Sequence, residues 1–318
     1  MRFRMFAKIP THRAAPPRAM GGPWVALEKL HGAQLVVGYD SGEVVVGKRK
    51  AWLAPDEPFF GWQLIANDLA TAITAIARAA GAPQVIAFGE LIGGAYPHPE
   101  VPAVPGLSAI QTGIWYTPGL AWLPFDMLVA SGDDDDGELL AHGEVEALAA
   151  AAGLHTPPRL ARGTRAELER VEVRFATRVP AWFGLPALAD NLAEGIVLKP
   201  DARCAPDDRP VIKRKLPEFS DDRFAEAEAW NPGRITEPDL VLWVERMVQP
   251  ARLASARSKV GASPAAILDE VALDIAVDLG LAFPAAWAQL GEPAQERLLA
   301  HARDLAAAML PAHGRQQG

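Results

Sequence analysis

The stretch WVALEKLHGAQLVVGYDSGEVVVGK, residues 24–48, decides how the fold of this chain is interpreted. Its apolar residues fall into three short runs, separated by His31-Gly32 and by Asp40-Ser41-Gly42, which are residue types that favour turns. Short runs rich in Val, Leu and Tyr are typical of β-strands. The sequence therefore predicts an antiparallel meander with strands over residues 24–30, 35–39 and 44–46.

Beyond this stretch, the sequence predicts helices and further strands in irregular alternation. Residues 64–80 are rich in Ala, carry apolar residues at helical spacing and end at Gly81, so we expect a helix there. Residues 97–118 are rich in Pro and Gly and predict a long loop. We also expect strands over residues 85–91 and 121–129 and a helix over 137–152. Irregular alternation favours a mixed α+β fold over a doubly wound parallel sheet.

The sequence changes character after Trp230-Asn231-Pro232-Gly233. The rest of the chain is dominated by Ala, Leu and charged residues at helical spacing, with repeated prolines. Ser263-Pro264 has the pattern of a helix N-cap followed by Pro at the first helical position. We therefore predict an α+β domain of antiparallel sheets and helices at residues 1–232, followed by a small all-helical domain at residues 233–318.

The composition limits the class of protein. The chain has 318 residues, of which 50% are hydrophobic, with one cysteine and a formal net charge of −8. This size suits about two domains, and a single cysteine excludes an internal disulfide partner. No leader-like segment or long apolar run stands out, which predicts a cytoplasmic protein that does not enter a membrane.

Basic residues occur in short clusters despite the acidic balance. Arg2 and Arg4 belong to a basic N-terminal segment, and further clusters lie at residues 48–50 and 213–215. The negative net charge argues against a protein that coats nucleic acid indiscriminately, because phosphate neutralisation requires many Lys and Arg residues. A local basic groove remains compatible with this sequence.

Lys29 is the candidate nucleophile. It ends an apolar strand just before Gly32, which permits close approach of the backbone to a ligand. A lysine attacks only as the neutral amine, and nearby cations such as Lys213 and Lys215 would disfavour its charged form. Because these two lysines are two residues apart on a strand, they share one face, and Arg214 points to the other.

Two glutamates are candidates for holding a ribose hydroxyl and a divalent cation. Glu90 and Glu194 each lie beside a glycine at the end of an apolar strand. Mg²⁺ at phosphates is usually held by one or two carboxylates together with water. The acidic run at residues 133–136 is instead interpreted as a solvated turn, because consecutive residues do not converge on one ion.

Six segments, in this order, resemble the RNA ligase 2 family of phage-type, ATP-dependent ligases that seal breaks in duplex RNA. These ligases are covalent nucleotidyltransferases, and His31 stands where DNA ligases and capping enzymes usually have aspartate. The segments are residues 21–32, 48–50 with 59–62, 88–91, 125–126, 194–199 and 211–215. Residues 252–253 and 258–261 are also similar to the family's C-terminal domain. The resemblance implies a nucleotidyltransferase (adenylation) domain followed by the helical domain.

The resemblance implies a reaction in three steps. Lys29 attacks the α-phosphorus of ATP, with Mg²⁺ or Mn²⁺ as the metal, and forms a lysyl-AMP phosphoramidate. The AMP then moves to the 5′-phosphate of an RNA end. A neighbouring 3′-hydroxyl displaces the AMP and closes the strand.

The resemblance also assigns roles to individual residues. The catalytic residues are Lys29, His31, Glu194, Lys213 and Lys215. Residues that bind the nucleotide are Glu28, Lys29, Arg49 at a phosphate, Glu90 at the ribose, Phe125 on the adenine, Glu194, Lys199, Lys213 and Lys215. The residue that holds the metal is Glu194. Residues expected to bind RNA are Gln34, Arg49, Arg252 and Lys259.

The chain departs from the family pattern at Leu27, Ala33 and Gln34, which predicts slower sealing after an intact self-adenylylation. Two alternatives stay open. A DNA-nick ligase or guanylyltransferase would use the same lysine, but His31 and the lack of a strand-rich domain after Trp230 count against it. A catalytically weakened nucleic-acid-binding module is disfavoured because such a chain has no physical reason to keep a costly cluster of charges in a cleft.

Overall fold

The computed structural model describes residues 1–7, 9, 21–219 and 235–310 of the chain. Its contacts divide the chain into two compact units. The first unit comprises Met1–Ala54 and Ala72–Ala229, and the second comprises Pro55–Thr71 and Trp230–Gly318. The predicted boundary between residues 232 and 233 lies outside the described residues and stays a prediction. The internal segment Pro55–Thr71 joins the helical unit, which was not anticipated from the sequence.

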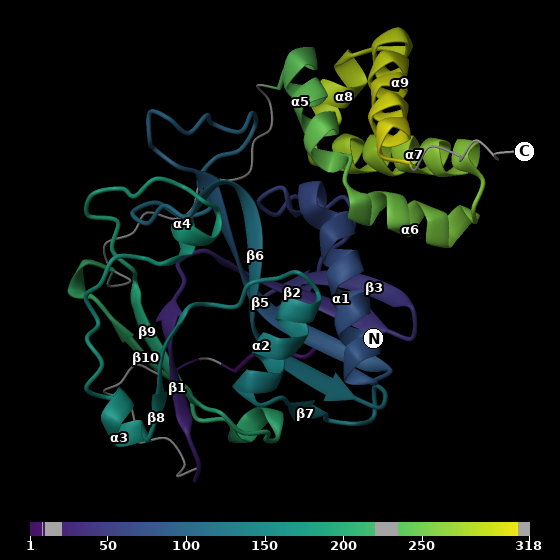
Figure 1. Cartoon of the computed structure of the whole chain (residues 1–318). Helices are drawn as coiled ribbons and strands as arrows, with labels where there is room; N and C mark the ends of the chain where they lie inside the picture. The colour runs from purple at the N-terminus through teal and green to yellow at the C-terminus, as the bar shows by residue number, and fades with distance from the viewer. Residues whose placement is uncertain (8, 10–20, 220–234, 311–318) are drawn as a thin grey trace, which may run out of the picture. The chain divides into compact units, whose positions relative to one another are not determined.

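The first unit contains two antiparallel sheets (Figure 1). The four-stranded sheet has the order β10-β9-β1-β8, with β1 at Trp24–Lys29, β8 at Arg159–Gly163, β9 at Gly195–Pro200 and β10 at Ile212–Lys215. The six-stranded sheet has the order β4-β3-β2-β5-β6-β7. Its strands are β2 at Ala33–Asp40, β3 at Glu43–Lys48, β4 at Ala51–Trp52, β5 at Gln84–Ala95, β6 at Thr117–Ala130 and β7 at Glu138–Leu139. The predicted α+β class is confirmed.

The predicted meander is wrong at the connection between its first two strands, β1 and β2. All three strands form, and β2 pairs with β3 as expected, but β1 pairs with β8 and β9 in the other sheet. The chain passes from one sheet to the other at Leu30-His31-Gly32. A side chain at Gly32 would clash with the Leu91 carbonyl oxygen of β5, so this crossing requires the missing Cβ. A turn signal in the sequence does not distinguish a hairpin from such a crossing.

Helices and short 3-10 turns accompany the sheets. The helices before residue 220 are α1 at Ala66–Ala80, α2 at His142–Ala151, α3 at Arg165–Leu168 and α4 at Val179–Trp182. The 3-10 turns are η1 at Trp62–Ile65, η2 at Pro206–Asp208 and η3 at Pro217–Phe219. The helix predicted over residues 137–152 begins only at His142, because Glu138 and Leu139 pair with β6 instead.

The second unit is helical in its described C-terminal part, as predicted. Its helices are α5 at Glu237–Met247, α6 at Pro250–Val260, α7 at Pro264–Ala282, α8 at Pro284–Gln289 and α9 at Glu292–Met309. Each has Pro at its first or second position, where the missing N–H costs no hydrogen bond. Ser263 caps α7 through its side chain. Among the described helices, none combines the length and apolar character needed to span a bilayer.

Strand β1 is buried on both faces, which determines where the site forms. Trp24 and Ala26 pack on one face against Ile196 and Leu198 of β9. Because side chains alternate along a strand, Leu27 and Lys29 face the opposite side. One short strand therefore supplies part of a hydrophobic core with one face and a lysine with the other.

We predict that Gly195→Ala disrupts the junction of β9 with β10. Gly195 has φ +152, and a Cβ there would clash with the Arg214 carbonyl oxygen. We expect a loss of about 2 kcal/mol or more in the free energy of unfolding, measured by denaturant titration. Gly119→Ala in β6 is the matched control, because nothing lies within 4 Å of its ideal Cβ. Equal stability of both variants would contradict the prediction.

Candidate active site

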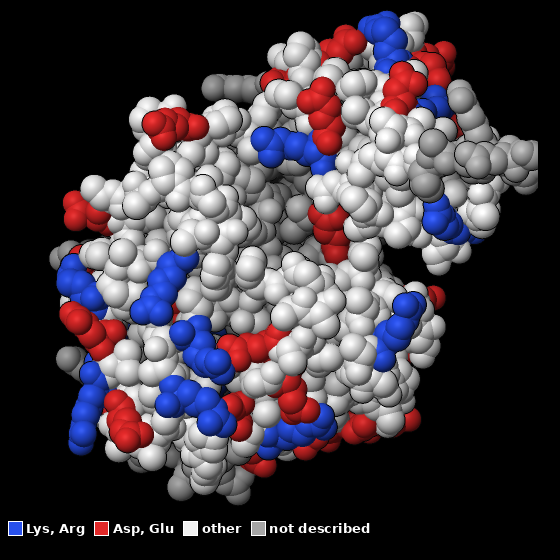
Figure 2. All heavy atoms as spheres, viewed as in Figure 1, with Lys and Arg blue, Asp and Glu red and all other residues white. Residues whose placement is uncertain are grey.

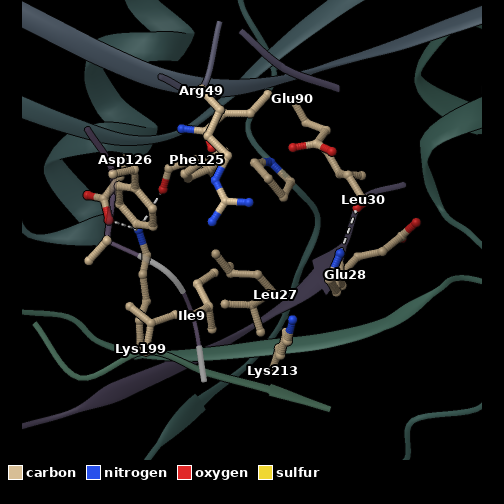
Figure 3. A pocket seen from close by; sticks show the side chains of 17 residues that line it. Ile9, Leu27, Glu28, Leu30, Arg49, Glu90, Phe125, Asp126, Lys199 and Lys213 are labelled. Atoms are coloured by element: carbon tan, nitrogen blue, oxygen red, sulfur yellow. Dashed lines mark hydrogen bonds and ion pairs between the residues drawn. The ribbon is translucent and has the colours of Figure 1, made fainter. Parts of the chain in front are cut away.

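A cavity of about 540 Å³ lies within the first unit (Figure 3). The four-stranded sheet and its flanks contribute lining residues Leu27, Glu28, Lys29, Leu30, Val197, Lys199, Val211 and Lys213. The six-stranded sheet and its flanks contribute Gln34, Arg49, Glu90, Phe125 and Asp126. Most of the residues predicted to act on a nucleotide therefore come together from segments that are far apart in the sequence.

The register of the four-stranded sheet explains why two lysines converge. Gly195 of β9 lies opposite Lys29 of β1 on one side and opposite Lys215 of β10 on the other. Residues that are opposite one another across antiparallel strands point to the same face. A Cβ at Gly195 would clash with the Arg214 carbonyl oxygen, so the missing side chain is what allows β9 and β10 to pair here. Arg214 points the other way and donates to the Glu169 and Val171 carbonyl oxygens, as the two-residue spacing predicted.

Glu194 is the buried anion that both lysines bind. Its Oε2 lies 2.5 Å from Lys29 Nζ and its Oε1 lies 2.7 Å from Lys215 Nζ, while only 1% of its side chain is exposed. His31 Nδ1 lies 3.6 Å from Oε2. Burial would raise the pKa of this carboxyl, but the hydrogen bond from His31 and the two ammonium groups outweigh burial and lower the pKa to about 2. Glu194 is therefore an anion at neutral pH.

The structure adds an anion to the surroundings expected for Lys29. From the sequence, Lys213 and Lys215 were expected to lie near Lys29 as cations. The structure places the Glu194 carboxylate between Lys29 and Lys215. Lys213 lines the cavity one step along the same face, opposite Val197.

Glu90 faces the cavity from the other sheet. Its Oε1 accepts a hydrogen bond from the Gly32 backbone N–H at 3.1 Å, so it also fixes the crossing between the sheets. Burial raises the pKa of Glu90 to about 7, although the charge of Lys29 partly opposes the shift. Gln34 lies opposite Glu90 in the β2–β5 ladder, and its amide nitrogen has no partner among the described residues. Both side chains are positioned to bind a polar ligand.

Tyr116 is a site residue that the sequence patterns did not reveal. It is 1% exposed, and its hydroxyl oxygen accepts a hydrogen bond from the His31 backbone N–H at 2.9 Å. Burial raises the pKa of this phenol well above its usual range. Tyr116 therefore holds the turn that follows Lys29. It lies in a stretch predicted as a loop, where no periodic pattern marks a buried side chain.

The Phe125 end of the cavity is fixed by a second set of buried charges. Lys199 Nζ donates to the Phe125 carbonyl oxygen at 2.6 Å and lies 3.3 Å from Asp126 Oδ2. Arg209 Nη1 donates to Asp126 Oδ1 at 2.6 Å. Burial lowers the pKa of Lys199, and the charge of Asp126 opposes that shift. Lys199 lines the cavity and its ammonium also holds the backbone at Phe125, so its predicted phosphate role stays a prediction. Arg209 was missed because its partners are distant in sequence.

The predicted nucleotide-binding role of Glu28 is not supported for its carboxylate. Glu28 faces away from Lys29 on β1, and its carboxylate accepts hydrogen bonds from the Thr177 hydroxyl and, at 3.0 Å, from the Arg178 backbone N–H. Only 1% of Glu28 is exposed, and burial raises its pKa to about 7. Its carboxylate therefore anchors the segment that leads into α4, while the residue itself contributes to the cavity wall.

A metal at Glu194 would need ligands from outside the chain. Within residues 1–7, 9, 21–219 and 235–310, no group of three or more His, Cys, Asp or Glu side chains could hold a metal ion. Both Glu194 oxygens contact ammonium groups. A site with one protein carboxylate is suited to Mg²⁺ only when phosphate and water oxygens complete the coordination.

The two residues of the helical unit that were predicted to bind RNA have structural partners. Arg252 is 3% exposed; its Nη2 lies 2.7 Å from Asp278 Oδ2, and its Nε donates to the Met247 carbonyl oxygen. Lys259 Nζ lies 2.9 Å from Asp274 Oδ1 and 3.0 Å from Glu270 Oε1. These contacts join α6 to α7. Arg252 is buried in them, whereas Lys259 is exposed, so RNA binding by Lys259 stays a prediction.

The visible surface gives no alternative basic stripe. Figure 2 shows Lys and Arg interspersed with Asp and Glu over the face that it draws. Arg49, exposed in the turn after β3, remains at the cavity, where it was predicted to meet a phosphate.

We predict that Arg252→Ala destabilises the helical unit by roughly 3 kcal/mol, because it removes a buried guanidinium and leaves the half-buried Asp278 without its partner. Thermal and denaturant unfolding measure this loss. Arg257→Ala is the control on the same helix, since Arg257 is exposed, and its effect should stay within about 0.5 kcal/mol. A folded, equally stable Arg252→Ala protein that binds RNA less well would restore the RNA-binding role.

The raised pKa of Glu28 predicts a pH-dependent effect of Glu28→Gln. The protonated form stabilises the folded state below pH 4.5, and this contribution is lost as pH rises towards 7. The glutamine variant should therefore gain stability relative to wild type by roughly 1–2 kcal/mol between about pH 5 and about pH 7.5. Urea unfolding at both pH values measures this.

Asp135→Asn is the control for this pH effect. Hydrogen bonds from the Ser131 and Gly137 backbone lower the pKa of Asp135 to about 2. Its folded and unfolded values both lie below about pH 5, so its effect should be the same at both pH values. A pH-independent effect of Glu28→Gln would show that Glu28 is ionised throughout this range.

Comparison with known proteins identifies the family. A family model described as RNA ligase matches residues 22–215, more than half of the chain. The chain is 32% identical over 200 residues to mitochondrial RNA-editing ligase 2 of Trypanosoma brucei brucei, covering 55% of this chain and 48% of that protein. It is 31% identical over 210 residues to mitochondrial RNA-editing ligase 1 of the same organism, covering 55% and 44%. The chain thus spans about half the length of the curated relatives it matches.

Solved structures of an RNA ligase from Naegleria gruberi are also similar. A mutant form with ATP and Mn matches with a TM-score of 0.41 and 16% identity, covering 62% of this chain and 50% of that chain. Another mutant form, with AMP and Mn, matches with a TM-score of 0.43 and 16% identity over the same shares. The family match spans β1 to β10 and includes Lys29, Glu90, Glu194 and Lys215; the chain belongs to the RNA ligase family.

Proposed function

We propose that this protein is an ATP-dependent ligase of the RNA ligase 2 type, which joins a 3′-hydroxyl to a 5′-phosphate in duplex RNA through a lysyl-AMP intermediate. The observation that carries the proposal is the ion-pair cluster of Lys29, Glu194 and Lys215, of which Lys29 lines the cavity, within the region that matches the RNA ligase family. The names of the relatives describe RNA-editing ligases, which agrees with RNA as the substrate.

Lys29 is the proposed nucleophile. In its resting state it forms an ion pair with Glu194, so it must leave this contact and lose a proton before it attacks. Its Nζ then forms a bond to the α-phosphorus of ATP as the bond to pyrophosphate breaks. Glu194 keeps the neighbouring ammonium of Lys215 in place for the negative charge that develops on the phosphate.

The other lining residues suit the remaining parts of ATP. Phe125 offers an aromatic ring for the adenine at the end of the cavity where Lys199 and Asp126 fix the backbone. Glu90 faces the same cavity and is proposed to accept a hydrogen bond from the ribose. Lys213 and Arg49 are proposed to bind the phosphates. Mg²⁺ or Mn²⁺ held between Glu194 and the phosphates would neutralise phosphate charge.

The later steps are proposed to use the turn after Lys29. The His31 side chain lies against Glu194, and Tyr116 holds its backbone, so the imidazole is kept close to the nucleophile. We propose that His31 serves the transfer of AMP to the RNA 5′-phosphate. The amide nitrogen of Gln34, a residue of the cavity wall, is proposed to contact that phosphate.

The domain assignment is part of the proposal. We assign adenylyl transfer to residues 1–232 and a supporting role to the helical domain at 233–318. Because Arg252 is buried in an ion pair with Asp278, we propose that any contact of that unit with RNA uses exposed residues such as Lys259. A DNA-nick ligase or guanylyltransferase is the second candidate, since the same lysine chemistry serves all three.

Self-adenylylation tests the proposal directly. Purified protein is incubated with Mg²⁺ and ATP or GTP labelled at the α-phosphate, and covalent label is read on a denaturing gel. We expect label from ATP and none from Lys29→Ala. Lys50→Ala, which removes an exposed lysine outside the cavity lining, is the matched control and should label normally. Lys213→Ala should slow labelling about 100-fold.

The substrate is then decided with defined strands. Adenylylated protein is given nicked duplex RNA, nicked duplex DNA or single-stranded RNA, each with a 5′-phosphate and a 3′-hydroxyl. Preferential sealing of the RNA nick supports the proposal, and preferential sealing of DNA rejects it. Label from GTP alone would indicate capping chemistry, and no label from either nucleotide would reject a covalent nucleotidyltransferase.

A further inference from the structure

The segment at residues 1–7 and 9 forms part of the cavity wall. Phe6, Ala7 and Ile9 line the cavity together with Phe125. In the sequence, this segment stood out only as a source of basic residues. Its position beside Phe125 gives it a direct connection to the site.

The acidic turn binds this segment. Arg4 is 8% exposed and donates to the carbonyl oxygens of Gly132, at 3.1 Å, and of Asp135. The Arg2 backbone N–H donates to Asp133 Oδ1 at 2.8 Å, and this bond is the largest cause of the lowered pKa of Asp133. The exposed turn predicted at residues 133–136 is therefore solvated and also holds the basic segment by specific contacts.

The six-stranded sheet provides space for the same segment. Phe3 packs edge-on against Trp52 of β4, with ring centroids 4.9 Å apart. A Cβ at Gly38 of β2 would lie 2.6 Å from Met1 Sδ and 2.8 Å from the Trp52 ring. A Cβ at Gly47 of β3 would lie 3.1 Å from the Phe3 ring. Glycines within these strands thus permit the segment to lie close to the sheet.

Phe6 links the segment to the aromatic residue of the site. Its ring lies edge-on to Phe125, with centroids 5.1 Å apart, and tilted against Phe88, with centroids 5.2 Å apart. It also packs against the core that contains Val36 and Leu128. Phe125 is therefore held through its backbone by Lys199 and through its ring by Phe6.

We infer that Phe6 is a positioning residue for the nucleotide, because it fixes the ring of Phe125 at the base-binding end of the cavity. The inference deepens the proposed function and rests on it, because Phe125 is taken as the adenine platform. Phe6 affects nucleotide binding by holding the ring of Phe125 and by forming part of the cavity wall. The contacts of Arg2 and Arg4 within the protein assign them to holding this segment in place.

The test compares two aromatic residues of the same segment. Phe6→Ala removes the ring beside Phe125, whereas Phe3→Ala removes a ring that packs on Trp52 and does not line the cavity. We expect Phe6→Ala to raise the ATP concentration that half-saturates self-adenylylation about three- to tenfold, with near-normal final labelling. By the same reasoning, Phe3→Ala should change it less than about twofold.

A second measurement keeps the outcome independent of catalysis. The dissociation constant of ATP with Mg²⁺ is measured by calorimetry for wild type, Phe3→Ala, Phe6→Ala and Phe6→Leu. Phe6→Leu keeps most of the buried volume and serves if Phe6→Ala does not fold, and it should also weaken ATP binding. Thermal unfolding of each variant separates loss of stability from loss of affinity.

The outcomes distinguish the two proposals. Weaker ATP binding in the Phe6 variants but not in Phe3→Ala supports the inference. Unchanged affinity in the Phe6 variants, with normal labelling of wild type, overturns the inference and leaves the proposed function in place. An equal loss in the Phe3 and Phe6 variants reduces the segment to a general stabilising role and overturns it too. Absence of ATP binding by wild type rejects both.

Discussion

A single buried carboxylate organises the catalytic end of this protein. Glu194 is 1% exposed and would be costly as an isolated anion, but two ammonium groups contact its two oxygens. Gly195 lies opposite both Lys29 and Lys215, and its missing side chain allows β9 to pair closely with the β10 backbone that carries Lys215. Removal of any one of these three charges leaves the other two without full charge compensation. A substitution at Lys29, Glu194 or Lys215 is therefore expected to change both the stability of the fold and the chemistry at Lys29.

Buried, paired charges occur near both ends of the cavity and have a different role at each end. At one end, the buried charges surround the side chain of Lys29. At the other end, Lys199 donates to the Phe125 carbonyl oxygen, and Lys199 and Arg209 both pair with the neighbouring Asp126. The first cluster keeps charged groups where phosphate charge would develop, whereas the second orients an apolar ring. Preorganisation of this kind lowers the cost of ordering the site when a ligand binds.

Much of this fold could be predicted from the sequence, because the strands have strong local patterns. The alternation around Lys213 and Lys215 correctly predicted their common face. Local patterns could not show that β1 and β2 belong to different sheets, since a Gly turn serves both a hairpin and a crossing. They also could not show that Glu28 and Arg252 are buried beside distant partners. Tyr116 and Arg209 were missed because only tertiary contacts make them part of the site.

The length of the crossing at Leu30-His31-Gly32 fixes how β2 is aligned with β5. The crossing joins the strand of the nucleophile to the strand that lies opposite Glu90, and these strands belong to separate sheets. A one-residue insertion would reverse the alternation of β2 relative to β5 and turn Gln34 away from the cavity. The hairpin turn at residues 40–42 sets a different register, because Asp40 pairs directly with Glu43 and only Ser41 and Gly42 lie between them. A change in length is thus expected to displace Gln34 when it falls at the crossing, and to shift β3 relative to β2 when it falls at the turn.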